Sequence, residues 1–491
     1  MKETIVPPVI GFGMDSSFKS PYFHSDRNAT TASRISRRPL FVLFAIFVVN
    51  TPSFAGTTLM TEKQITFSPK HHWLDNNDNF SADGRFLCYD TREMVGPGIE
   101  NSQSIEKVEI ATGRETVLYK PAEIITGAQA APGVGAASFS PVADAVVFIH
   151  GPLVSDVPRR GFYAKPNRNG AEVSADGAGK LAWLDFRDVE TSRDTLPGAH
   201  RGGTHRHEYT LDGRRIGFTY DDFLLPQYER TIGYMERHPK APGGASCWFA
   251  VLVPVVPKGA SKPGEIERAL GDSWIGREGL MRAFIGTVRE DDGAGYQDSL
   301  FVVDIPKDVD IATADSGSAL RYPKPPKGTH IRRLTHTWAS GTVRGSPDGR
   351  RIAYYGRAED GTTQIFIIPS DGSDRSDDPA KRPVQATHFP KGAGPGLRWH
   401  PSGGAIFCIS DNGIAATCVK PGRRFGKTTF LTPHGDEPPR IELVVSPDGR
   451  TLAYTKPVPT RDETGTRKTA YNGADCQQIF TVEFAPERRD R

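Results

Sequence analysis

The chain has 491 residues, with 51 glycines, 39 prolines and a hydrophobic content of 37%. Its 61 basic and 58 acidic residues nearly balance, which excludes a general electrostatic attraction to nucleic acid or to an anionic membrane. Many glycines and prolines beside a moderate apolar content are typical of short strands joined by tight turns. The composition therefore favours an all-β fold over a helical one.

The N-terminus has the features of an export signal. Residues 1–39 are polar and basic, and an apolar run follows over 40–49. The run is too short to span a bilayer, and the small residue Ala55 suits a signal peptidase. We therefore expect an export signal over 1–55 and a periplasmic or otherwise exported mature protein with no stable membrane span. The alternatives are a membrane-held tail and a start of translation at Met14.

A four-residue turn recurs along the rest of the chain. Clear copies are Ser446-Pro447-Asp448-Gly449 and Ser346-Pro347-Asp348-Gly349, each followed by a strand rich in β-branched and aromatic residues. Proline presets φ at the first corner and glycine supplies the positive φ that a tight hairpin requires. Weaker copies begin at Ser81, Ser140, Leu211 and His400.

A second repeated element precedes several of these turns and reads as the outer strand of the preceding unit. Its copies are Gln64-Ile65-Thr66-Phe67, Arg333-Leu334-Thr335-His336, Gln385-Ala386-Thr387-His388 and Phe430-Leu431-Thr432-Pro433. The last three turns lie about 50 residues apart, a period typical of a β-propeller. We predict a single propeller over 56–491 with seven blades. Six blades, or unrelated turns in a β-sandwich, are the alternatives.

Two segments have special places in this scheme. Lys63 to Phe67 precedes the first blade, so we expect it to complete the last blade beside Gln478 to Val482 and to close the ring. Residues 222–280 interrupt the pattern, and we expect an insert over one rim. Within it, we predict a two-turn helix, because Pro263 suits the start of a helix and Gly271 suits the position just after its end.

The five cysteines show no Cys-x-x-Cys spacing, which argues against a structural zinc site. Cys408 and Cys418 flank the turn Asp411-Asn412-Gly413. A three-residue loop would place their sulfurs on facing strand positions, where an oxidising compartment could join them. Buried free thiols are the other interpretation.

Histidines are the strongest candidates for chemistry. His205 and His207 lie two residues apart on a predicted inner strand, which would aim both imidazoles into the channel, and His150 ends a strand one blade away at the same rim. Three imidazoles could hold a transition metal, or one could act as a general base. The alternative is that they bond neighbouring backbone and fill the channel mouth.

Other enzyme classes have less support. The chain contains no Gly-x-Ser-x-Gly elbow followed by an α/β domain, and no Walker or dinucleotide-binding loop. These absences argue against a peptidase with a propeller lid and against a nucleotide-dependent enzyme.

From Lys63 to Tyr454 the chain resembles the YidR-like propellers, a bacterial family of unassigned biochemical function. The resemblance rests on Gln64-Ile65-Thr66-Phe67, Val147-Phe148-Ile149-His150-Gly151-Pro152, Arg201-Gly202-Gly203-Thr204-His205, Gly217-Phe218-Thr219-Tyr220, Ala283-Phe284-Ile285-Gly286 and Trp399-His400-Pro401-Ser402-Gly403.

More remotely, the turns resemble those of TolB-type propellers and of oligogalacturonate lyases. In those lyases a rim of histidines and a glutamine binds manganese, and Phe148-Ile149-His150 and Thr204-His205 resemble two of the histidine stretches. Where the lyases have a paired His-x-His, this chain has Ser340-Gly341-Thr342, so the implied metal site is incomplete.

We therefore expect an exported, monomeric propeller that acts as a binding or scaffolding module through its histidine-rich rim. Its partner would be a protein or an acidic oligosaccharide, with no nucleic acid, no firmly implied cofactor and no assigned catalytic residue. The alternative is a polysaccharide lyase that uses manganese or another divalent metal. Its site would be His150, His205 and His207, with Arg201 binding the substrate carboxylate.

Overall fold

The structure is a computed structural model that describes residues 60–75, 78–93, 98–178, 180–470 and 473–484. The expected export signal lies outside these residues. Among the described residues, no helix is both long enough and apolar enough to cross a membrane.

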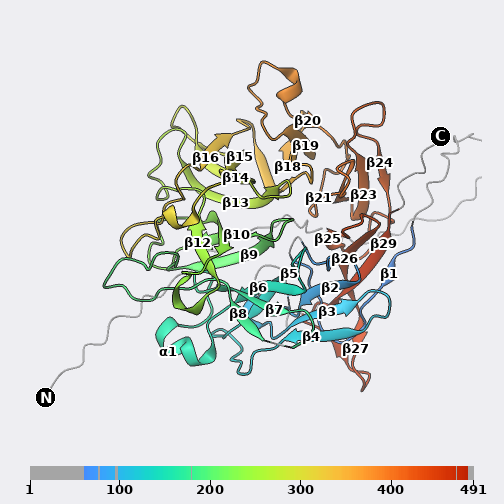
Figure 1. The fold of residues 1–491 in the computed structure, drawn as a ribbon. Helices are drawn as coiled ribbons and strands as arrows, with labels where there is room; N and C mark the ends of the chain where they lie inside the picture. The colour runs from blue at the N-terminus through green and yellow to red at the C-terminus, as the bar shows by residue number, and fades with distance from the viewer. Residues whose placement is uncertain (1–59, 76–77, 94–97, 179, 471–472, 485–491) are drawn as a thin grey trace, which may run out of the picture. The chain divides into compact units, whose positions relative to one another are not determined.

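Seven antiparallel sheets surround a common centre, so the seven-bladed propeller is confirmed (Figure 1). In blades 1 to 6 the strands follow one another outward in chain order. Blade 1 holds β2 (Phe86–Asp90), β3 (Ile105–Glu109) and β4 (Glu115–Tyr119). Blade 2 holds β5 (Val134–Phe139), β6 (Ala145–His150), β7 (Asn169–Ser174) and β8 (Leu181–Trp183). Blade 3 holds β9 (Gly203–Tyr209), β10 (Arg215–Asp221), β11 (Thr231–Arg237) and β12 (Cys247–Val251). In blade 1, bridges from Trp73 to Asp90 and from Phe80 to Leu87 extend the sheet toward the centre.

The remaining blades repeat this plan. Blade 4 holds β13 (Ile266–Ile275), β14 (Met281–Arg289), β15 (Tyr296–Asp304) and β16 (His330–Arg333). Blade 5 holds β17 (Ala339–Gly345), β18 (Arg351–Arg357), β19 (Thr363–Pro369) and β20 (Val384–Gln385). Blade 6 holds β21 (Arg398–Trp399), β22 (Ala405–Ser410), β23 (Gly413–Cys418) and β24 (Thr428–Phe430). Blade 7 holds β25 (Ile441–Val445), β26 (Thr451–Val458), β29 (Cys476–Glu483) and β1 (Lys63–Gln64), and it carries a hairpin of β27 (Thr460–Arg461) and β28 (Arg467–Lys468).

Helical structure among the described residues is confined to short connections. These are α1 (Val157–Arg160) and the 3-10 turns Ile99–Asn101, Val154–Asp156, Pro242–Gly244, Ile311–Thr313 and Pro379–Lys381.

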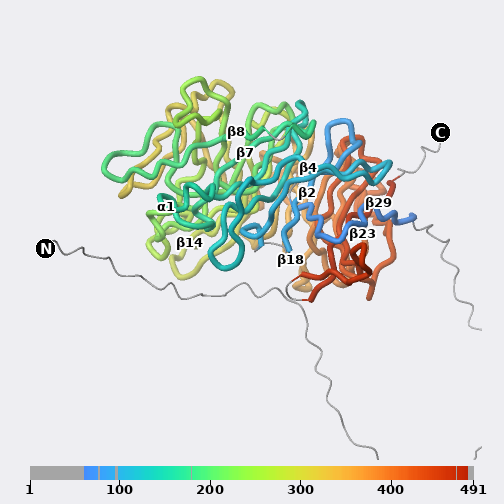
Figure 2. Tube along the Cα trace, turned by 90° about the horizontal axis from the view of Figure 1, so that it is seen from below, coloured from blue at the N-terminus to red at the C-terminus, as the bar shows by residue number. Residues whose placement is uncertain are grey.

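The closing strand is confirmed. Lys63 pairs with Thr481 and Gln64 with Phe480, which places the first described strand beside the last in the view of Figure 2. Arg440, whose side chain is buried, anchors the same segment through two 2.7 Å hydrogen bonds to the carboxylate of Glu62. The added strand covers the outer edge of β29, which would otherwise present unpaired backbone groups.

The repeated turn folds by one hydrogen-bond pattern. The Ser446 hydroxyl donates to Asp448 at 2.6 Å and accepts from the Thr451 N–H at 2.9 Å, while Gly449 takes a φ of 74°. The same two bonds form in the turns that begin at Ser81 and Ser346, and in the turn at Leu211, where the preceding Thr210 supplies the hydroxyl. The serine or threonine at the first position therefore ties the innermost strand to the second strand of each of these blades.

The second repeated element also has a defined role. Its threonine is buried beyond the end of the outer strand and accepts a backbone N–H from the third strand of the same blade. These bonds run from Ile479 to Thr66, Leu300 to Thr335, Ile365 to Thr387 and Ile414 to Thr432, at 2.8 to 3.0 Å. Each hydroxyl takes the place of a ladder carbonyl at the point where the outer strand departs.

The innermost strands share an irregularity that the sequence did not predict. Five of them shift register against the second strand. A residue with positive φ lies at each shift: Ala136, Arg206, Gly271, Gly341 and Glu442, at 51° to 70°. An extra residue of this kind ends the strict alternation of side chains along the strand.

The insert expected over 222–280 is wrong. These residues contain β11, β12 and β13, which are regular strands of blades 3 and 4. The predicted helix is also wrong, because Ile266–Ile275 pairs with β14 from Val288 to Met281. Strand pairing and burial in the sheet outweighed the preference of proline for the start of a helix and of glycine for its end.

The facing placement of Cys408 and Cys418 is likewise wrong. Asp411 and Asn412, both with positive φ, make a two-residue turn, so Cys408 pairs with Ala415 and Cys418 with Ala405. All five cysteines are free thiols.

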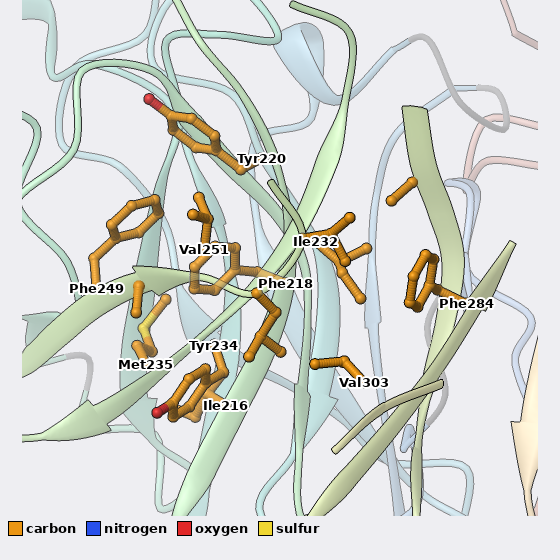
Figure 3. Packing of buried hydrophobic residues seen from close by; sticks show 14 of the residues in the cluster. Ile216, Phe218, Tyr220, Ile232, Tyr234, Met235, Phe249, Val251, Phe284 and Val303 are labelled. Atoms are coloured by element: carbon orange, nitrogen blue, oxygen red, sulfur yellow. The ribbon is translucent and has the colours of Figure 1, made fainter. Parts of the chain in front are cut away.

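The largest group of buried apolar side chains among the described residues lies in blades 3 and 4. It includes Phe218 and Phe249, whose rings stack at 5.1 Å, and Phe284 of the next blade (Figure 3). These side chains are at most 1% exposed. The blades therefore hold the central strands on a rigid support.

Candidate functional site

Two polar regions lie at different ends of the innermost strands, and β9 passes through both. His205 lies toward its start and His207 in its second half, while Glu208 and Tyr209 at its end line a cavity. We call His150, His200, His205 and His207 the histidine cluster, and we call the space at the turn end the turn-end cavity.

His205 has a partner at each ring nitrogen. Its Nδ1 accepts from the guanidinium of Arg168 at 2.9 Å, so its Nε2 carries the proton and donates to Asp221 at 2.9 Å. Burial and the nearby cations Arg230 and Arg168 lower the pKa of His205 to about 3. The imidazole is therefore neutral at physiological pH, and its lone pair faces a hydrogen-bond donor.

His150 is used in the same way one blade earlier. Its Nδ1 donates to the carbonyl of Gly151 at 2.5 Å, which leaves Nε2 to accept from the hydroxyl of Tyr119 at 2.9 Å. Burial lowers the pKa of His150 to about 4. The ring packs edge-on against Trp183 at 4.8 Å, so it fills the sheet as well as bonding within it.

His207 belongs to a separate chain of hydrogen bonds. Its Nε2 donates to the Thr204 hydroxyl at 3.1 Å, and that hydroxyl donates to Asp185 at 2.6 Å. Burial lowers the pKa of His207 to about 4. Asp185 also accepts from Asn169 at 2.7 Å and lies 3.5 Å from His200. Although burial opposes its ionisation, His200, His207 and Thr204 hold the pKa of Asp185 at about 2.

These partners do not suit the predicted metal site. The bulge at Arg206 separates His205 and His207, because the two rings no longer follow the alternation of an undisturbed strand. The lone pairs of His205 and His150 are occupied by Arg168 and Tyr119. In the described part of the chain, no group of three or more His, Cys, Asp or Glu side chains is arranged to hold a metal ion.

Arg201 is also committed to its own loop. It donates to the Thr195 hydroxyl at 2.7 Å, to the Arg193 carbonyl at 2.9 Å and to the Glu190 carbonyl, and it is 3% exposed. The structure therefore places this guanidinium where it braces the connection between blades 2 and 3. Three further histidines lie beside carboxylates: His72 beside Glu115, His336 beside Asp374 and His434 beside Asp411.

The turn-end cavity has a volume of about 500 Å³, and every blade contributes to its lining. Its walls combine charged and aromatic side chains. Those that bear on chemistry are Asp78, Glu208, Arg344, Arg398, Trp274 and Trp399. Its size lies within the range of small-molecule sites, about 300–1,000 Å³.

The two indoles are fixed in place. The Trp274 Nε1–H donates to the carbonyl of Glu208 at 3.0 Å, and the Trp399 Nε1–H donates to the carbonyl of Arg344 at 2.8 Å. Each bond reaches the innermost strand of the preceding blade. The aromatic walls are therefore part of the contacts that hold neighbouring blades together.

Two arginines of adjacent blades converge on one carbonyl. Arg344 Nε donates to Leu397 O at 3.2 Å, and an Arg398 Nη donates to the same oxygen at 2.8 Å. Burial lowers the pKa of both guanidinium groups, and Arg344 also lowers that of Arg398. The cavity wall therefore holds two cations that repel each other in a poorly solvated place.

Two acidic residues, Asp78 and Glu208, line the same cavity. Glu208 lies 3.4 Å from Arg282 and 3.9 Å from Arg344. Burial and the neighbouring Glu208 raise the pKa of Asp78 to about 7, against the opposing effect of Arg344 and Arg398. Asp78 therefore gives up much of its negative charge near neutral pH.

The charged residues of this cavity were not predicted from the sequence, although a signal for them exists. Glu208, Arg344 and Arg398 each stand two residues before the first residue of a repeated turn, where the other copies have Asn79, Ser138 and Val444. An alignment of the turns would have identified three charged residues at one buried repeat position.

Comparisons with known proteins give one family match and several structural similarities. Residues 133–239, which span blades 2 and 3, match a family described as a protein of unknown function, DUF3748. Solved structures with similarity include the β-propeller domain of the Trilobed protease from Pyrococcus furiosus (10% identity, TM-score 0.42, covering 86% of this chain and 100% of that one) and TolB from Acinetobacter baumannii (12%, 0.36, covering 82% and 81%). At these values the likeness carries no functional implication.

The sequence relationship to one curated protein is stronger. The uncharacterised protein YidR of Escherichia coli (strain K12) is 31% identical over 426 residues, covering 80% of this chain and 94% of the relative. The chain therefore belongs to the YidR family of β-propellers.

Proposed function

We propose that this protein is a binding module that takes its ligand in the turn-end cavity. The observation that carries the proposal is a cavity of about 500 Å³ whose lining comes from all seven blades and includes two carboxylates, three arginines and two indoles. Buried charge beside aromatic surface is typical of sites that orient a small molecule or a single side chain of a partner. This conclusion moves the expected binding surface from the histidine rim to the other end of the channel.

The lyase alternative has less support from the side chains. A metal site built on His150, His205 and His207 would have to displace Tyr119 and Arg168 from the ring nitrogens that they occupy. Arg201 would have to leave three acceptors to meet a substrate carboxylate. Each displacement would leave a buried polar group without its partner, at about 1–3 kcal/mol or more for a charged group. Binding therefore explains the structure better than metal-dependent cleavage.

Export remains part of the proposal. The sequence features of residues 1–55 suit a leader that is cleaved on export, so we propose that the mature protein begins near Gly56 and acts outside the cytoplasm. The chemistry of the cavity suits either a small acidic compound or an acidic group of a protein partner.

The cavity can be blocked without disturbing its walls. Ala82 lies at the exposed corner of a turn and lines the mouth, so Ala82→Trp should obstruct entry. Ala294, which is exposed in the turn between β14 and β15, gives a control as Ala294→Trp. The mature protein would be melted with a panel of acidic, basic and neutral small compounds. We expect stabilising compounds to act on wild type and Ala294→Trp but not on Ala82→Trp. Equal stabilisation of all three proteins, or of none, would contradict the proposal.

A further inference from the structure

The two arginines Arg344 and Arg398 give the turn-end cavity a preference for a negatively charged ligand. Arg344 and Arg398 come from neighbouring innermost strands and share the Leu397 carbonyl. A guanidinium forms two parallel hydrogen bonds with a carboxylate, and an anion between two guanidinium groups removes their repulsion. The place beside Leu397 O is therefore where a ligand anion would gain most.

The acidic residues of the cavity limit how much charge that anion can carry. The Glu208 side chain lines the same cavity and lies 3.4 Å from Arg282 and 3.9 Å from Arg344. A dianion such as a phosphate monoester would meet this carboxylate at close range in a poorly solvated place. A monoanion would be attracted more than it is repelled, since the lining has three arginines (Arg277, Arg344 and Arg398) and two acidic residues (Asp78 and Glu208).

Four aromatic side chains contribute to the remaining walls, and each of them is at most 8% exposed. Trp274 and Trp399 flank the arginine pair along the ring of blades, and Phe80 and Phe139 line the side contributed by blades 1 and 2. Arg282 lies over the Trp274 ring at 4.4 Å and Arg351 over the Trp399 ring at 5.0 Å. These guanidinium groups and the indole N–H bonds hold the rings in fixed positions. Fixed aromatic walls bind a flat apolar body at little entropic cost.

Building on the proposed binding function, we infer that the turn-end cavity takes a small monocarboxylate with a flat apolar body. Its carboxylate lies between Arg344 and Arg398, and its apolar body packs against Trp274 and Trp399. A free aromatic or polycyclic acid has this chemistry.

Three related compounds separate the contribution of the ligand's carboxylate to binding from that of its flat apolar body. 2-Naphthoate carries the carboxylate and the flat body, 2-naphthamide keeps the body without the charge, and acetate keeps the charge without the body. Calorimetry on the wild-type mature protein should give a 2-naphthoate affinity at least tenfold above those of the amide and of acetate, because a charge-assisted bidentate pair is about twice as strong as a neutral one. Naphthyl phosphate should bind more weakly than 2-naphthoate.

Variants then locate the carboxylate. Arg344→Gln and Arg398→Gln should each weaken 2-naphthoate binding about tenfold and leave the weak binding of 2-naphthamide unchanged. Arg350→Gln is the matched control, since Arg350 is exposed in the turn of the same blade and does not line the cavity. If a glutamine variant fails to fold, the comparison of wild-type probes still decides.

The outcomes distinguish the ligand class from the binding function. Equal binding of 2-naphthoate and 2-naphthamide, both lost in Ala82→Trp, would overturn the monocarboxylate while the cavity remained the binding site. Binding of 2-naphthoate that persists in Ala82→Trp would overturn both. Tighter binding of naphthyl phosphate than of 2-naphthoate would also overturn the monocarboxylate.

Discussion

The histidine cluster and the turn-end cavity both contain polar and charged side chains, but they differ in the open space beside those side chains. In the cluster, His205 lies between Arg168 and Asp221, and His150 between Tyr119 and Gly151, so the ring nitrogens are used within the protein. In the cavity, charged groups of several blades face about 500 Å³ of space. Polar residues therefore mark a candidate site here only where open space lies beside them. We therefore expect the histidines to stabilise the fold, and we propose that the charged residues of the cavity meet a ligand.

Asp185→Ala should have the largest effect on stability. Asp185 is 2% exposed and accepts from Asn169, Thr204 and the Gly170 N–H. Removing it leaves these donors and His200 without their buried acceptor, so we expect unfolding in urea to become easier by about 3–5 kcal/mol. The 2-naphthoate affinity of the folded fraction should not change. The exposed Asp176→Ala is the control and should melt as wild type does. A loss below about 1 kcal/mol would show that the cluster is not structural.

Asp78 should make ligand binding depend on pH. The groups that face it are Glu208, Arg344 and Arg398, and its pKa is raised to about 7. Below that pH Asp78 is protonated and the cavity favours an anion. Above it, the new negative charge opposes the carboxylate. The raised pKa also makes the folded state lose stability as pH rises from the ordinary aspartate value of 3.8 to about 7. The affinity for 2-naphthoate should therefore fall by up to about tenfold between pH 6 and pH 8.

The pH effect has a direct control. Asp78→Asn cannot ionise, so its affinity should stay at the low-pH value across this range. An affinity that rises with pH in wild type, or an equal fall in Asp78→Asn, would show that another group governs binding.

Metal ions should have the smallest effect. Because the lone pairs of His150 and His205 meet donors, manganese or zinc should raise the melting temperature of wild type no more than that of His205→Ala. A saturable rise in wild type that His205→Ala removes would instead support the lyase alternative. The measurement is a thermal melt over a range of metal concentrations in a buffer that does not bind metals.

The blades were predictable because their signals are local. Serine, aspartate and glycine of the repeated turn bond to one another within six residues, and Thr66, Thr335, Thr387 and Thr432 occupy equivalent places at the ends of outer strands. Such short-range chemistry is readable from a sequence. The closing strand followed from the same repeat, since Gln64-Ile65-Thr66 has the pattern of an outer strand.

The site was harder to predict because it depends on register. The bulge at Arg206 changes where His205 and His207 point, and it comes from the pairing of β9 with β10 and not from a local motif. Residues 222–280 read as an insert because blades 3 and 4 lack the clear turn. Glu208 and Arg398 are ordinary surface residues by type, and only the closed ring of blades buries them together.

The most direct measurement is a crystal structure of the mature protein soaked with 2-naphthoate. The account predicts ligand density in the turn-end cavity, with the carboxylate between Arg344 and Arg398 and the rings beside Trp274 and Trp399. Density at the histidine cluster, or an empty cavity at ligand concentrations that stabilise the protein in solution, would contradict it.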